Sequence, residues 1–66
     1  MIKLIEALKL AIENERNTKE QYRQQAREAV DPEVRLMFEH LARDEEKHEK
    51  QLVEKLQALK LLYLED

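Results

Sequence analysis

The residues best suited to chemistry are Glu45 and His48, which form a Glu-x-x-His step inside an apolar stripe. Residues three positions apart lie on the same helix face. The stripe that surrounds the step has the period of one buried helix face, and it consists of Val34, Phe38, Leu41, Leu52, Leu56, Leu59 and Tyr63. We therefore expect both side chains to point inward, where a carboxylate is costly unless it is paired or coordinates a metal.

A second carboxylate, Glu15, interrupts the apolar stripe of the N-terminal segment. That stripe comprises Leu4, Leu8, Ala11, Ile12, Tyr22, Ala26, Ala29 and Val30. If two antiparallel helices are joined by a turn at residues 31–32, Glu15 and His48 lie equally far from the turn, about 25 Å along the helix axis. Glu45 is one helical turn nearer to it. The spacing therefore predicts that Glu15, Glu45 and His48 share one level.

Composition and turn chemistry predict the elements that carry these residues. The 66 residues include no Gly and one Pro, with 41% charged and 42% hydrophobic residues, which is typical of long helices. The one turn signal is Val30-Asp31-Pro32-Glu33, where Asp can cap a helix and Pro suits its first position. We predict an all-α antiparallel hairpin forming a single unit over residues 1–66, with helices at about 2–30 and 33–64 around a turn at 31–32.

A hairpin of this size cannot enclose the three groups, because each helix would leave half of its stripe facing water. Two hairpins related by a two-fold axis would bury both faces as a four-helix bundle. The dimer would then hold four Glu and two His at its centre, which is the ligand set of carboxylate-bridged dinuclear sites. Two divalent ions would balance the four carboxylates, and this oxygen-rich ligation suits iron or manganese better than structural zinc, although zinc can substitute.

Glu15, Tyr22 and the run Asp44-Glu45-Glu46-Lys47-His48 resemble one half of a rubrerythrin or another ferritin-like di-iron domain. Because there is one helix pair, the chain is similar to half-size rubrerythrin-like proteins and encapsulated ferritins, over about residues 4–60. The resemblance implies two irons per homodimer, with Glu15 as a terminal or bridging ligand, Glu45 bridging and His48 terminal. It also implies that the centre oxidises Fe(II) with O2 or peroxide, as a ferroxidase or a peroxide-reducing oxidoreductase.

The sequence departs from the rubrerythrin pattern in two places. Thr18 stands where one half of a rubrerythrin carries a further carboxylate, which weakens a specifically peroxidase interpretation. The 66 residues contain no Cys and so no Cys-x-x-Cys rubredoxin segment, and an external electron donor is expected.

Each candidate also has a purely structural interpretation. Glu45 and His48 could form a polar layer that fixes helix register, and Glu15 alone could pair with Lys19 four residues on. Tyr22 is expected to be a core aromatic, with a role beside the metal ligands as the alternative. We place His40 on the solvated surface and expect Glu49 to pair with Lys or Arg. The competing function is a metal-free helical hairpin that acts as an oligomerisation or adaptor module.

Charge and hydropathy argue against some classes of binding partner. A net charge of −3 with interspersed signs provides no basic stripe for nucleic acid. No apolar run approaches the roughly 20 residues of a membrane span, and the N-terminal residues lack the layout of a signal peptide. We expect a cytoplasmic protein, alone or inside a protein compartment. Further association of dimers is expected through apolar residues at the open end of the hairpin, namely Ile2, Leu10, Leu61, Leu62 and Leu64.

Overall fold

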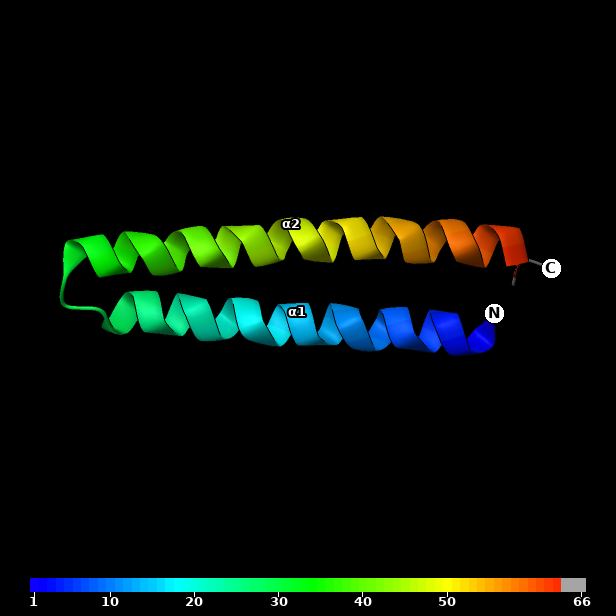
Figure 1. Cartoon of the computed structure of the whole chain (residues 1–66), viewed down its shortest axis with the longest axis horizontal. Helices are drawn as coiled ribbons and strands as arrows, with labels where there is room; N and C mark the ends of the chain where they lie inside the picture. The colour runs from blue at the N-terminus through cyan, green and yellow to red at the C-terminus, as the bar shows by residue number, and fades with distance from the viewer. Residues whose placement is uncertain (64–66) are drawn as a thin grey trace.

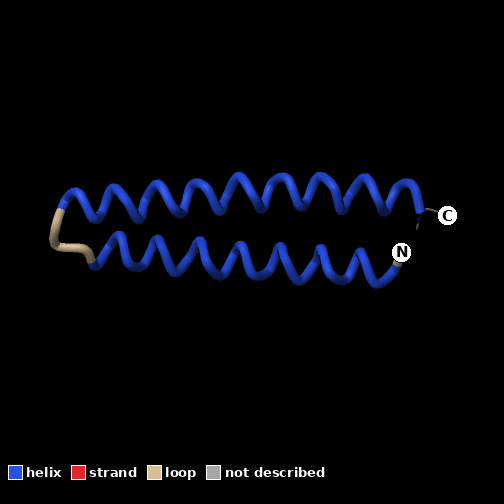
Figure 2. The backbone as a smooth tube through the Cα atoms, in the orientation of Figure 1, coloured by secondary structure: helices blue, strands red, loops and turns tan. Residues whose placement is uncertain are grey.

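The computed structural model describes residues 1–63 as two long helices packed side by side (Figure 1). Helix α1 spans Ile2–Glu28 and α2 spans Pro32–Tyr63. They form a rod of 52 × 14 × 13 Å, with the turn at one end and the N-terminus beside the end of α2 at the other (Figures 1 and 2). The predicted all-α hairpin is confirmed, and pairing of two hairpins into a bundle stays a prediction.

A short turn, tan in Figure 2, joins the two helices, and its residue types explain where each helix ends and begins. The Asp31 side chain caps α2, because its Oδ2 accepts a hydrogen bond from the Val34 amide at 2.9 Å. Pro32 is the first residue of α2, where its missing N–H costs nothing. Helix α1 ends at Glu28, and Ala29 is extended, with φ −70° and ψ 125°. The prediction that Val30 belongs to the inner face was wrong, since it lies in this turn and is 92% exposed.

The core lies toward the open end of the hairpin and is thin. Ile5, Ile12, Leu56 and Leu59 are buried against one another, and the partly buried side chains packed on them are Leu8, Leu52 and Val53. Nearer the turn, the buried side chains are the small residues Ala26 and Ala42. Between these regions the helices meet through polar side chains. The middle of the hairpin is therefore where charged groups approach one another across the interface.

The apolar stripes predicted from the sequence are only partly covered. Leu4, Val34 and Leu41 remain 49%, 39% and 39% exposed, whereas Ile5 and Ala42, which the predicted stripes omit, are buried. The other helix thus covers only part of each predicted stripe, which includes the buried Ile12, Leu56 and Leu59. Among residues 1–63 no side chain is less than 2% exposed. One hairpin leaves much of its apolar surface uncovered.

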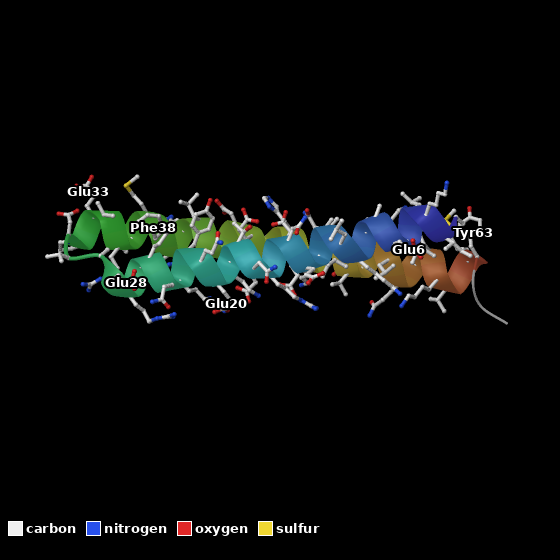
Figure 3. All side chains as sticks on the ribbon, turned by 90° about the horizontal axis from the view of Figure 1, so that it is seen from below. Glu6, Glu20, Glu28, Glu33, Phe38 and Tyr63 are labelled. Carbon is white, nitrogen blue, oxygen red and sulfur yellow. The ribbon has the colours of Figure 1, made fainter. Side chains whose placement is uncertain are left out.

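The two sides of the rod differ in chemistry. Val34, Met37 and Leu41 are exposed and, at spacings of three and four residues, share one side of α2; together with the exposed Leu4 of α1 we call them the apolar flank. Ion pairs join the helices elsewhere along the rod, between Arg16 and Glu49 and between Arg23 and Glu46, and we call the surface that carries them the charged side. Charged side chains such as Glu6, Glu20, Glu28 and Glu33 project along the rod in Figure 3. Neither helix, over residues 1–63, is long and apolar enough to cross a membrane.

Candidate metal centre

The structure brings the three predicted ligand residues together. One donor atom from each of Glu15, Glu45 and His48 lies within 4.8 Å of the other two. His48 Nδ1 is 3.5 Å from Glu15 Oε2 and 3.9 Å from Glu45 Oε2. Helix α1 supplies Glu15, and one turn of α2 supplies the other two residues. The level match expected from an antiparallel register is therefore present, and the role of the group as metal ligands stays a prediction.

The three side chains differ in exposure. Those of Glu15 and Glu45 are 25% and 19% exposed, whereas that of His48 is 54% exposed. The expectation that His48 points inward is therefore wrong for a single hairpin. His48 follows Leu41 by seven residues, two helical turns, and so shares the side of α2 that carries the apolar flank. The imidazole lies at the edge of the helix interface, on the side where the hairpin is uncovered.

Glu15 has a buried oxygen without a protein partner. Among the described residues, its Oε2 is the one buried side-chain polar atom that lacks a hydrogen bond. Such an atom is costly and calls for a specific explanation. It faces the His48 nitrogen at 3.5 Å, too long for a good hydrogen bond. Two ligands bonded to one ion at about 2.0–2.2 Å lie at most about 4.4 Å apart, so both contacts of His48 suit a shared cation.

The nearness of two carboxyl groups alters the proton affinity of Glu45. Its pKa is raised above 4.5, first because a protonated Glu45 can share a hydrogen bond with Glu15, then by burial and by repulsion from the Glu15 charge. His48 opposes the rise and Asp44 adds slightly to it. The helices thus hold two acidic groups against their mutual repulsion. A bound cation would relieve that repulsion.

A second polar cluster borders the first, on the charged side of the rod. Glu49 accepts hydrogen bonds from Lys19 Nζ at 2.8 Å and from Arg16 Nε at 2.7 Å. These two cations lower the pKa of Glu49, Lys19 more than Arg16. The expected pairing of Glu49 with Lys or Arg is present. The alternative pairing of Lys19 with Glu15 is not what the structure shows, because the ammonium bonds across the interface to Glu49.

Tyr22 and His40 lie outside the carboxylate and imidazole cluster. The Tyr22 ring stacks on Phe38 with centroids 6.1 Å apart and an interplanar angle of 30°. Tyr22 is half-buried, and no hydrogen bond of its hydroxyl is present within residues 1–63. It is a packing aromatic here, and a role beside metal ligands stays a prediction. His40 is exposed, as expected.

The donor set indicates which ions the cluster suits. Two carboxylates and one imidazole from one chain favour iron or manganese among the divalent metals. Three protein donors would leave further coordination positions of such an ion open. A second hairpin could supply the remaining carboxylates there, as the four-helix arrangement requires.

Comparison with known proteins identifies the family. The family model described as Rubrerythrin matches residues 3–63, nearly the whole chain and all three residues of the cluster. No curated protein and no solved structure matches the chain. The hairpin fold, the Glu15, Glu45 and His48 cluster and this match agree with one another. The chain belongs to the rubrerythrin family, a family of ferritin-like di-iron proteins.

Proposed function

We propose that this chain forms a homodimeric four-helix bundle that binds two irons and oxidises Fe(II) with O2 or peroxide. The observation that carries the proposal is the buried, unpartnered Glu15 Oε2, which faces His48 Nδ1 across the helix interface. Glu45 adds a third donor from the same turn as His48. Membership of a di-iron family supports iron as the metal.

A second copy of the chain would resolve two features that a single hairpin leaves incomplete. The apolar flank, with Leu41 on the same side of α2 as His48, would be covered by its counterpart. The four carboxylates of two copies of Glu15 and Glu45 would carry a charge that two divalent ions cancel. Burying these carboxylates would then cost less free energy, because the two metal ions would cancel their charge at the centre of the bundle.

Each residue has a distinct role in this proposal. Glu15 and Glu45 would provide anionic oxygen ligands, one from each helix. His48 would provide a nitrogen ligand, and its place on α2, one turn from Glu45, fixes the direction from which the imidazole approaches the metal. The rigid helices hold these donors near one another before any ion arrives. Two Fe(II) ions held by these residues would supply two electrons, which with two protons from solvent reduce O2 to hydrogen peroxide, or hydrogen peroxide to water, and leave two Fe(III). Later reduction would need an electron donor outside these 66 residues.

Anaerobic loading with Fe(II) followed by addition of O2 or hydrogen peroxide tests the proposal. We expect the protein to oxidise Fe(II) faster than buffer alone, with two irons oxidised per dimer, and we expect Glu45→Gln to lose this activity. Oxidation no faster than in buffer would contradict the proposed chemistry. A protein that forms the same oligomer without binding any metal would favour the adaptor function instead.

A further inference from the structure

Lys19 lies where it could neutralise the candidate metal centre. It follows Glu15 by four residues on α1, the spacing at which a carboxylate and a following ammonium pair on one helix face. Its side chain is only 14% exposed, so the charge is held near the helix interface. Such a pair would occupy the carboxylate that the proposed function assigns to a metal ion.

The structure instead directs the ammonium to the other helix. Lys19 Nζ is 2.8 Å from Glu49 Oε1, and Glu49 is itself only 16% exposed. Glu15 Oε2 remains without a hydrogen bond. The bond from Lys19 to Glu49 is a charge-assisted hydrogen bond between two largely buried side chains. Among residues 1–63, Lys19 therefore pairs with Glu49 and makes no ion pair with Glu15.

Arg16 completes the arrangement around Glu49. Its Nε donates to the second carboxylate oxygen, Oε2, at 2.7 Å. With one cation on each oxygen, the Glu49 carboxylate is held by two charge-assisted hydrogen bonds. Arg16 immediately follows Glu15, and neighbouring residues on a helix do not face each other. Arg16 is thus a support for Glu49, and Lys19 is the cation that competes for Glu15.

We propose that Glu49 is a positioning residue that holds Lys19 away from Glu15 and so keeps the Glu15 and Glu45 pair free of an ammonium partner and open to a metal cation. The inference rests on the proposed function, since it assumes that this pair binds metal. Glu49 itself does not touch the metal ion. It acts through Lys19, and its removal would release the ammonium to close onto Glu15.

Metal titration with Mn(II), which is stable in air, tests this role. Glu49→Gln keeps the side-chain volume and loses the charge, and we expect it to weaken Mn(II) binding about 10- to 100-fold, the range for residues that orient metal ligands. Glu46→Gln removes an equal charge from an exposed position on the same helix and should leave binding within about threefold, well below the range for orienting residues. Equal affinity in Glu49→Gln and the unaltered protein would overturn the proposal.

Two rescue variants separate the position of Lys19 from simple charge. Adding Lys19→Gln to Glu49→Gln should restore Mn(II) affinity, because no ammonium remains to occupy Glu15. Adding Arg16→Gln to Glu49→Gln restores the same net charge but leaves Lys19 in place, and should not restore affinity. Equal rescue by both variants would mean that only net charge matters, and would overturn the proposal.

A metal-free measurement keeps this inference distinguishable from the proposed function. A double-mutant cycle between Lys19→Gln and Glu15→Gln, followed by urea unfolding with a chelator present, measures the coupling of the two side chains. We expect no coupling with Glu49 intact, and a favourable coupling in the Glu49→Gln background. Absence of that new coupling would overturn the inference. Failure of the unaltered protein to bind metal would contradict the proposed function, and the cycle would still decide whether Glu49 holds Lys19.

Discussion

His48 Nδ1 lies 3.5 Å from Glu15 Oε2, across the interface between α1 and α2, and that oxygen has no hydrogen-bond partner among residues 1–63. The contact is too long to satisfy the buried oxygen and short enough for both atoms to bind one cation. It links the fold to the proposed chemistry, because only the antiparallel register brings the two atoms together.

Removal of the imidazole should remove the metal. We expect His48→Ala to lose stoichiometric iron binding while the helices remain formed, because its side chain is half exposed and contributes little to the core. His40→Ala is the matched control, since His40 is an exposed histidine on the same helix and outside the cluster. Iron content and circular dichroism of the two variants check this. Two irons per dimer retained in His48→Ala would exclude the residue as a ligand.

A charge on the apolar flank should prevent dimerisation. Leu41 is 39% exposed in one hairpin, and its replacement by Lys adds a charge that only a dimer would bury. We expect Leu41→Lys to weaken dimerisation at least tenfold, or about 1.4 kcal/mol. Analytical ultracentrifugation measures this, and iron binding should be lost in parallel.

Leu36→Lys is the control for Leu41→Lys. Leu36 is 54% exposed and lies on a different side of α2 from His48. The same substitution there should leave the dimer and its iron content unchanged. Equal loss in both variants would locate the interface elsewhere.

Metal removal should destabilise the protein. Binding to the folded state alone adds about 2.7 kcal/mol of stability when the free metal concentration is 100 times the dissociation constant. We therefore expect a chelator to lower the midpoint of thermal unfolding and to promote dissociation of the dimer. Differential scanning calorimetry at several protein concentrations measures both effects. A midpoint that the chelator leaves unchanged would favour the metal-free adaptor.

The metal-free protein should lose stability as the pH rises through the folded-state pKa of Glu45. That pKa is raised above 4.5, chiefly by hydrogen bonding with Glu15, so the folded protein holds this proton more tightly than the unfolded chain does. The resulting stabilisation is fully present when the pH is below the pKa of Glu45 in the unfolded chain, and it is lost as the pH rises through the higher pKa of Glu45 in the folded protein. Urea unfolding with a chelator, compared with Glu45→Gln, isolates the effect. A difference between the two proteins that does not vary with pH would contradict the coupling.

The Tyr22 hydroxyl should matter less than its ring. The ring stacks on Phe38, and no hydrogen bond of the hydroxyl is present among residues 1–63. We expect Tyr22→Phe to change the free energy of unfolding by less than about 0.5 kcal/mol, and Tyr22→Ala to lower it by about 0.5–3 kcal/mol. Iron-binding titrations should give the same affinity for Tyr22→Phe as for the unaltered protein. A clear loss of affinity would instead give the hydroxyl a role beside the metal ligands.

The sequence predicts the hairpin and the position of Glu15, Glu45 and His48 well, because both depend on simple geometry. A fixed rise per residue and one turn at Asp31 and Pro32 determine which residues are level. The sequence predicts less well which apolar residues of each helix are buried. Ile5 and Leu4 are neighbours in sequence and both apolar, yet Ile5 is buried between the helices and Leu4 is exposed.

The choice of partner for Lys19 could not be predicted from the sequence. Spacing on one helix favours Glu15, whereas the structure pairs Lys19 with Glu49 on the other helix. Such a choice depends on the distance between the helices and on side-chain rotamers, which residue spacing does not determine. For the same reason, the exposure of His48 becomes evident only once the edge of the interface is known.

Measurement of the native mass together with the metal content of freshly purified protein tests the central claim most directly. A di-iron centre shared by two hairpins predicts a dimer, or a multiple of it, with two iron atoms per dimer, and joint loss of iron and of the dimer in His48→Ala. A monomer, or a dimer that holds no metal after exposure to Fe(II), would contradict it.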